Sequence, residues 1–156
     1  MHSFLPEQDI DYTIVVVEQY DDLKFNRGKL FNAGYVETLK RNSKICCFIF
    51  HDVDLLPENQ NHIYACSRSP RHMCVSVNTL RYNLMYRDLF GGVIAIRRDH
   101  FKLVNGFSNS YWGWGGEDDD MFVRITESNL NITRWEPDLS RYFMLSHKKE
   151  AANSER

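Results

Sequence analysis

Two acidic motifs in the sequence could do chemistry, and the first is Asp52-Val53-Asp54. It follows the apolar run 45–50 after one histidine, His51, and such a run is typical of a buried strand. Where a strand breaks into a loop, one carboxylate can bind a divalent cation while the other accepts a hydrogen bond from a ribose hydroxyl. Mg²⁺ or Mn²⁺ with oxygen ligands would neutralise a nucleotide diphosphate. The same triplet also occurs by chance at solvated strand ends, so the motif alone is weak.

The second motif, Trp112 to Asp120, is more specific because it combines two tryptophans, three glycines and four consecutive acids. Tryptophan rings offer apolar faces to pyranose C–H groups and a polar N–H at the edge. Glycines let a backbone approach a ligand and permit hinge motion. Carboxylates accept hydrogen bonds from sugar hydroxyls, and one can act as a general base. The alternative is an acidic first turn of a helix beside the helix dipole, but the whole pattern favours a sugar site.

Two weaker candidates lie nearer the ends of the chain. Phe25 could pack on a base and Arg27 could bind phosphate or uracil oxygens, although both residues also suit an ordinary helix start. His147, with Met144 three residues before it, could complete a metal site with Asp54. A thioether is a soft ligand, which favours a transition metal such as Mn²⁺ over Mg²⁺.

These residues need a scaffold, and the sequence predicts alternating strands and helices. Strands are expected at 12–18, 45–50, 73–77, 91–96 and 132–135, and helices at 26–40, 98–104 and 117–128. The inward face of the first helix is predicted to carry Phe31, Tyr35, Val36 and Leu39. The alternation indicates an α/β layered domain, in which ligands bind beyond the carboxyl ends of the strands. Asp52 and Asp54 lie at such an end.

The composition fits one globular domain and argues against several classes of protein. The 156 residues are 43% hydrophobic and 26% charged with a net charge of −2, which does not suit a nucleic-acid binder. No stretch approaches the roughly 18 apolar residues of a membrane span, and the N-terminus lacks the features of a signal peptide. The four cysteines form no zinc pattern. One disulfide with two thiols, or four reduced cysteines, fits equally well. Asn131-Ile132-Thr133 is a glycosylation sequon, usable only in a secretory protein.

Together the motifs resemble the β-1,4-galactosyltransferase family (glycosyltransferase family 7). The matching pieces run in order along nearly the whole chain: Phe25-Asn26-Arg27 with Lys29, 48–55, Pro70-Arg71-His72, Phe90-Gly91-Gly92-Val93, Asn105-Gly106-Phe107, Tyr111 to Asp120, and Met144 with His147. The resemblance implies a GT-A-type, Rossmann-like α/β fold for a nucleotide-diphospho-sugar transferase, here incomplete at both ends. Residues 1–156 would be the C-terminal portion of a single catalytic domain. The parent protein would be a type II membrane protein of the Golgi lumen, with its anchor outside this chain.

The resemblance also implies roles for individual residues. Mn²⁺ would be bound by Asp54, Met144 and His147. The donor would be bound by Phe25, Arg27, Asp52, Val53, Asp54, Leu89, Gly92, Trp114, Glu117 and His147. The acceptor would be bound by Trp114, Gly115, Gly116, Asp118, Asp119 and Arg156. Asp118 would be the catalytic base, and Cys47 and Cys66 would form a disulfide.

The reaction implied is an inverting transfer in which Asp118 takes a proton from the 4-hydroxyl of a terminal N-acetylglucosamine, and that oxygen displaces UDP from the donor sugar. Where galactose-specific vertebrate members of the family have tyrosine, this chain has Leu89. A tyrosine ring beside the donor C2 would crowd an N-acetyl group, and invertebrate relatives with an aliphatic residue here transfer N-acetylgalactosamine. We therefore expect UDP-GalNAc as the donor, with UDP-galactose as the alternative.

Other departures and functions bear on this interpretation. Thr79 replaces a lysine that approaches the donor phosphates in galactose-specific members. Gly116 argues for an N-acetylglucosamine acceptor, because the xylose-directed branch differs there. A non-catalytic carbohydrate-binding module is a second class of function, against which the retained Asp118 and metal set argue. A calcium-binding structural domain would rest on the acidic run alone and leave Met144 unexplained.

Overall fold

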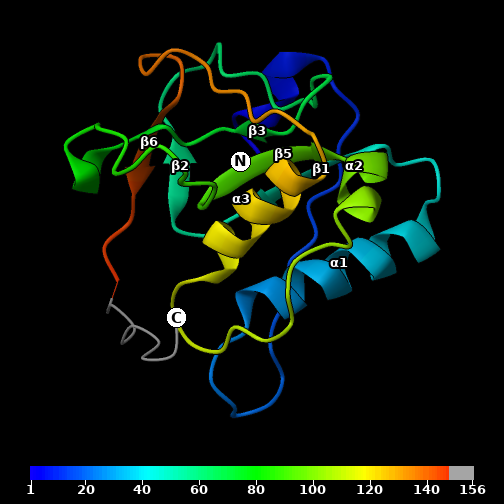
Figure 1. Ribbon diagram of the computed structural model, residues 1–156. Coiled ribbons are helices and arrows are strands. Elements are labelled where there is room, and N and C mark those ends of the chain that lie inside the picture. Colours follow the sequence, from blue (N-terminus) through cyan, green and yellow to red (C-terminus); the bar gives the residue numbers. More distant parts are fainter. Residues whose placement is uncertain (148–156) are drawn as a thin grey trace.

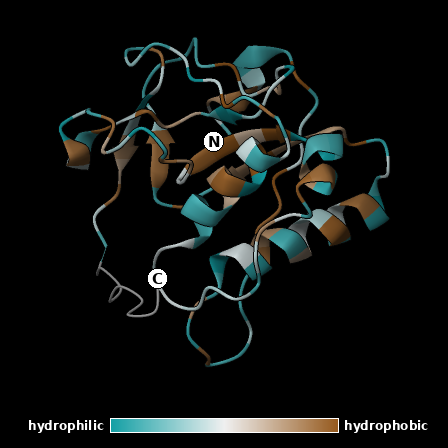
Figure 2. Ribbon diagram, viewed as in Figure 1, coloured by the Kyte–Doolittle hydropathy of each residue, from teal (hydrophilic) through white to brown (hydrophobic). Residues whose placement is uncertain are grey.

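The strand β5 (Val93–Arg97) lies at the centre of the molecule in a computed structural model that describes residues 1–147 (Figure 1). Its first four residues are buried, and the strand is hydrophobic along most of its length (Figure 2). Alternate side chains of a strand point to opposite faces. Ile94 and Ile96 accordingly enter one hydrophobic cluster, while Val93 enters another. The sheet therefore separates two cores.

Two antiparallel neighbours flank β5. The strand β1 (Cys47–His51) pairs with it along its whole length, and Phe48 lies opposite Ile96. The strand β3 (Arg71–His72) pairs on the other side, which gives the order β1-β5-β3. The strands predicted at 45–50 and 91–96 are thus confirmed, each displaced towards the C-terminus.

Three helices pack on one face of this sheet: α1 (Arg27–Arg41), α2 (Arg98–Leu103) and α3 (Glu117–Glu127). All three correspond to helices predicted from the sequence. The side chain of Asn26 caps α1 by accepting a hydrogen bond from the backbone N–H of Lys29 at 2.8 Å. None of the helices within residues 1–147 is long and apolar enough to cross a membrane.

The inner face of α1 packs mainly through aromatic rings. Tyr35 has its ring centroid 4.7 Å from that of Phe48 and 4.5 Å from that of Phe101. Phe31 and Leu39 pack against the same cluster. The prediction that Val36 belongs to this face is wrong, because its side chain is 47% exposed. Successive residues are rotated by about 100° around a helix, which carries Val36 away from the line of Phe31, Tyr35 and Leu39.

A second small sheet lies on the other side of the β5 sheet. Its order is β2 (Leu55–Pro57), β6 (Arg141–Met144) and β4 (Ser76–Val77), with β6 antiparallel to β2 and parallel to β4. The cluster beneath it includes Tyr142, which is fully buried, and two 3₁₀ turns, η1 (Leu5–Gln8) and η2 (Asn78–Leu80), complete the described elements.

Three strand predictions need correction. Residues 12–18 form no regular structure, and Val16 is 78% exposed. Their β-branched composition gives strand propensity, but within residues 1–147 no strand pairs with them. The expected strand at 132–135 is reduced to a single bridge between Thr133 and Arg71. The strand expected at 73–77 is formed only at its end, by β4.

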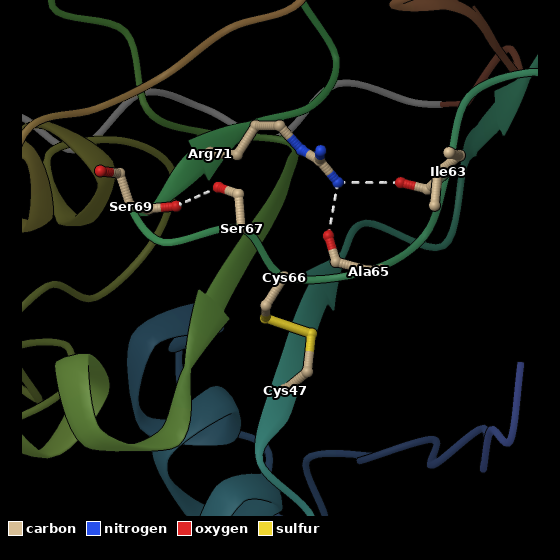
Figure 3. Close-up of a disulfide and its surroundings, with 7 residues drawn as sticks. All are labelled: Cys47, Ile63, Ala65, Cys66, Ser67, Ser69 and Arg71. Atoms are coloured by element: carbon tan, nitrogen blue, oxygen red, sulfur yellow. Dashed lines mark hydrogen bonds between the residues drawn. A yellow bond between two sulfur atoms is a disulfide. The ribbon is translucent and has the colours of Figure 1, made fainter.

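A disulfide joins the first residue of β1 to the loop that precedes β3 (Figure 3). Cys47 and Cys66 have their Cα atoms 5.5 Å apart, which confirms the pairing implied by the family resemblance. The same loop is held by Arg71, whose Nη2 donates to the carbonyl oxygens of Ile63 at 2.8 Å and Ala65 at 2.5 Å (Figure 3). Cys46 and Cys74 are free thiols, the first exposed and the second buried.

Replacing Cys66 with serine should lower the free energy of unfolding by about 3 kcal/mol, because the disulfide closes a loop with a sequence separation of 19 in the unfolded chain. Urea-induced unfolding of the oxidised protein measures this change. The matched control is Cys46→Ser, which alters an exposed free thiol and should change stability by less than about 0.5 kcal/mol. Equal destabilisation by the two variants would contradict a structural role for the disulfide.

Candidate active site

Arg27, the first residue of α1, joins four elements through its guanidinium group. Its Nε donates to Asp52 Oδ1 at 2.6 Å, its Nη1 donates to Glu117 Oε1 at 3.2 Å, and its Nη2 donates to the carbonyl of Gly92 at 3.2 Å. The group lies 4.5 Å from the centre of the Phe31 ring. These contacts bring together predicted site residues from the start of α1, the end of β1, the entry to β5 and the start of α3.

Burial and charge compete within this cluster. Burial lowers the pKa of Arg27, but Asp52 and Glu117 outweigh it and the pKa is raised overall. Burial raises the pKa of Glu117, and nearby Arg27 only partly offsets that effect. The Arg27 side chain is 14% exposed and that of Glu117 is 10% exposed, so solvent screens their ion pair weakly. The charge of Arg27 is therefore what permits these carboxylates to be placed together.

Asp118, the predicted general base, packs against a glycine. A Cβ atom at Gly91 would lie 2.5 Å from Asp118 Oδ2, so any side chain at position 91 would displace the carboxylate. Gly92 has a φ of +68°, and a Cβ there would meet the sulfur of Cys74 at 2.5 Å. Burial raises the pKa of Asp118, and its neighbour Asp119 raises it further. The two glycines are therefore needed for different reasons. Gly91 leaves room for the Asp118 carboxylate, and Gly92 adopts a backbone conformation that L side chains rarely adopt.

The glycine-rich turn before α3 carries the exposed Trp114. Gly115 and Gly116 have φ values of +99° and +100°, which L side chains rarely adopt. The N–H of Gly113 donates to the carbonyl of Phe25 at 2.7 Å, which ties this turn to the residues just before α1. Trp114 itself is 58% exposed. A flat, accessible indole beside a row of carboxylates is an arrangement that suits a sugar.

The four acids at the start of α3 differ in their contacts. Asp120 forms an ion pair with Arg124 one helical turn later, at 2.5 Å, and so supports the helix. Asp119 accepts a hydrogen bond from the hydroxyl of Tyr86 at 2.8 Å. Tyr86 was not among the residues predicted for the site. Nothing in the sequence separates it from the other tyrosines, since it lies 33 residues before its partner.

The predicted metal ligands come together where β2 and β6 pair. Asp54 immediately precedes β2, and Met144 at the end of β6 lies opposite Leu55 in the ladder. His147 Nε2 is 3.2 Å from Asp54 Oδ2. The sulfur of Met144 accepts a hydrogen bond from the hydroxyl of Thr79 at 3.4 Å. β6 was not predicted as a strand, yet its register is what places Met144 next to Asp54.

This donor set fits a divalent transition metal. It offers one carboxylate, one imidazole and one thioether, and the thioether and imidazole favour such an ion over Mg²⁺. Within residues 1–147 no cluster of three or more His, Cys, Asp or Glu side chains is placed to hold a metal. A site at Asp54 and His147 therefore depends on the sulfur of Met144 or on ligands from bound molecules.

The remaining predicted donor contacts are mostly accessible side chains. Phe25 is 46% exposed and Val53 is 87% exposed, while Leu89 is partly buried beside the fully buried Phe90. In the Asp52-Val53-Asp54 motif, Asp52 contacts Arg27 and Asp54 contacts His147. The predicted acceptor residue Arg156 lies outside the described residues.

The fold defines the class of the protein. The catalytic domain of Drosophila β-1,4-galactosyltransferase 7, solved with xylobiose, matches with a TM-score of 0.75 and 38% identity, over 85% of this chain and 55% of that chain. A mutant of the same Drosophila protein, solved with manganese, UDP-Gal and xylobiose, matches with a TM-score of 0.73 and the same identity and coverage. The expected GT-A-type α/β fold is confirmed.

The sequence comparisons then give the family. A model of the N-terminal domain of galactosyltransferase matches residues 71–148, and one of the N-terminal region of glycosyl transferase group 7 matches residues 1–67, so the chain belongs to the group 7 glycosyltransferase family. β-1,4-Galactosyltransferase 4 from Rattus norvegicus and from Homo sapiens are both 48% identical over 153 residues. These alignments include 98% of this chain but only 44% of each relative, so the chain spans less than half the length of the curated relatives it matches.

Replacing Arg27 with methionine should destabilise the fold by about 3 kcal/mol, because it leaves the Asp52 and Glu117 carboxylates without their shared cation. Chemical denaturation followed by far-UV circular dichroism gives this value. Lys40→Met is the matched control, since the Lys40–Glu37 pair is more than half exposed at both side chains and should contribute no more than about 0.5 kcal/mol. A similarly small effect at Arg27 would show that the cluster does not depend on its charge.

Proposed function

We propose that this chain provides much of the active site of a manganese-dependent, inverting β-1,4-galactosyltransferase. The donor is UDP-galactose, and the acceptor is the 4-hydroxyl of a terminal N-acetylglucosamine on a glycan. The observation that carries the proposal is the placement of Asp118, held against Gly91 with a raised pKa beside the Arg27 cluster and the exposed Trp114. The sequence identity to β-1,4-galactosyltransferases supports it.

The choice of galactose corrects the expectation drawn from Leu89. The relatives are galactosyltransferases, and one of them was solved with UDP-Gal. The similarity to them supports galactose, rather than N-acetylgalactosamine, as the sugar that this chain transfers. The physical reason is that the smaller donor is disfavoured only by a repulsive element or by contacts that the larger donor alone can make. A leucine in place of tyrosine removes a barrier to the larger sugar, but it creates nothing that excludes the smaller one. Leu89 therefore permits N-acetylgalactosamine without selecting for it.

In the proposed mechanism each residue group has a distinct task. Asp118 accepts the proton of the acceptor hydroxyl as its oxygen attacks the anomeric carbon of the donor, opposite the departing diphosphate. Burial raises the pKa of Asp118, which makes it a stronger base than an exposed aspartate once it is ionised. Glu117 binds the donor sugar and Asp119 the acceptor, while Trp114 lies between the donor and the acceptor and contacts both. Fixing both sugars in this way supplies much of the rate.

The remaining residues bind the nucleotide. Phe25, Arg27, Asp52 and Val53 would contact uridine and ribose, and Gly92 lines the same side of the site. Asp54, Met144 and His147 would hold Mn²⁺, which when bound supplies a Lewis acid that stabilises the leaving diphosphate. Gly115 and Gly116 would let the acceptor approach the backbone.

We also propose that residues 1–156 are part of a single catalytic domain in a larger Golgi-lumen protein that is anchored in the membrane. The alignments support a larger protein, because they cover only 44% of the relative's length. The disulfide between Cys47 and Cys66 independently supports a location in the secretory pathway, since disulfides persist in oxidising compartments.

Asp118→Asn should lower kcat for galactose transfer by roughly a thousandfold, because it removes the general base. Donor affinity, measured by calorimetry with UDP-galactose and Mn²⁺, should stay unchanged. In the wild type, kcat/KM should fall as the pH drops through the raised pKa of Asp118, since only the ionised carboxylate accepts a proton. The matched control is Asp120→Asn, whose carboxylate pairs with Arg124. Full transfer by Asp118→Asn would refute the assignment, and sugar binding without transfer by the wild type would indicate a carbohydrate-binding module.

Leu89→Tyr should reduce transfer of N-acetylgalactosamine by about tenfold or more relative to galactose, because the ring restores a barrier beside the donor C2. Steady-state kinetics with both donors on the full-length protein measure this ratio. The wild type is expected to turn over UDP-galactose at least as fast as UDP-GalNAc. A wild type that used only UDP-GalNAc would overturn the proposed donor.

A further inference from the structure

Backbone carbonyls of the segment 87–91, which carries Leu89, accept hydrogen bonds from a side chain outside the proposed site. Arg134 Nη2 donates to the carbonyl oxygens of Arg87 and Leu89, both at 2.8 Å. Arg134 lies beyond the end of α3, 45 residues from Leu89 in the sequence. Its guanidinium group therefore fixes a loop to which it has no local connection.

A buried histidine extends this contact to the end of the segment. Arg134 Nε donates to His72 Nδ1 at 3.2 Å. His72 is fully buried, and burial lowers its pKa to about 3, so the ring is neutral and its remaining proton lies on Nε2. His72 Nε2 lies 3.5 Å from the sulfur of Cys74, whose thiol donates to the carbonyl of Gly91 at 3.3 Å, and the His72 ring packs 6.2 Å from that of Phe90. Arg134 thus holds the segment at positions 87 and 89, while His72 contacts it at Phe90 and reaches Gly91 through Cys74.

Two residues of this segment, Leu89 and Gly91, bear on the proposed site. Leu89 is the residue whose size bears on the donor, and Gly91 is the residue against which Asp118 Oδ2 packs. A shift of the backbone here would move the donor pocket and the general base at the same time. The neutral His72 cannot itself attract the donor, and Arg134 contacts protein carbonyls. Their contribution must act through the segment.

From this we propose that Arg134 and His72 form a positioning pair that sets donor discrimination by fixing segment 87–91 between the donor pocket and Asp118. The inference rests on the proposed transferase function. It differs from a role in folding alone, because a residue that only stabilises the fold would affect both donors equally. A positioning residue changes the ratio between donors, since a sub-ångström movement of Leu89 alters the space beside C2.

The test compares Arg134→Met and Arg134→Lys with Arg97→Met, which changes an exposed arginine at the end of β5. For each full-length variant, kcat and KM are measured with UDP-galactose and UDP-GalNAc, alongside the thermal unfolding midpoint. Arg134→Met should change the ratio of kcat/KM between the donors by about tenfold and lower kcat by roughly ten- to a hundredfold. Arg134→Lys should restore part of the ratio, because an ammonium group replaces only some of the fork of donors. The control should match the wild type.

Equal losses with both donors, or an unchanged ratio, would overturn the positioning role while leaving the transferase proposal intact. A wild type that transfers neither sugar would instead overturn the proposed function. The structural part of the inference is then decided by hydrogen exchange. Amides of residues 86–91 should exchange faster in Arg134→Met than in Arg97→Met, and equal exchange would overturn it.

Discussion

The charge of Arg27 is the constraint on which the candidate site depends. Two carboxylates from different elements, Asp52 and Glu117, converge on it at the carboxyl end of β1 and the start of α3. Without a cation between them these groups would repel and would each retain solvent. Because Arg27 is also the first residue of α1, the position of that helix is linked to the position of the acidic turn. Placement of the acidic turn and packing of the helical layer are consequently coupled.

A second constraint is the absence of a side chain at position 91, next to Asp118. Gly91 leaves room for the carboxylate, and the segment in which that glycine lies is held by hydrogen bonds from Arg134 and by the packing of His72 on Phe90. The position of Asp118 is therefore fixed both by helix α3, to which it belongs, and by the segment 87–91, against which it packs. A base that must meet a sugar hydroxyl at hydrogen-bond distance needs such placement.

Local patterns in the sequence predict most of the scaffold, and their failures have a common cause. Helix α1 follows from the periodicity of its apolar residues, α3 follows from its acidic first turn, and β5 follows from its apolar run. The run at 12–18 has the composition of a strand but no partner within the described residues, whereas β6 forms because β2 and β4 flank it. Strand formation depends on residues distant in sequence, which a single sequence does not display. The contacts of Tyr86, His72 and Arg134 also join residues that are distant in sequence, and a single sequence does not reveal them. The pairing of Cys47 with Cys66 came from the family resemblance and not from spacing. The metal set of Asp54, Met144 and His147 was a weak candidate from residue types alone, and the resemblance made it specific.

The pairing of β2 with β6 also has a thermodynamic consequence. Asp54 and His147 are separated by most of the described chain, and the ladder between Leu55 and Met144 is what brings their segments together. A cation bound as proposed would have no comparable site in the unfolded chain. Its binding free energy would then be added to the stability of the β2–β6 ladder. The manganese concentration of the surrounding compartment would thereby control how firmly the last strand is docked, as well as whether the donor can bind.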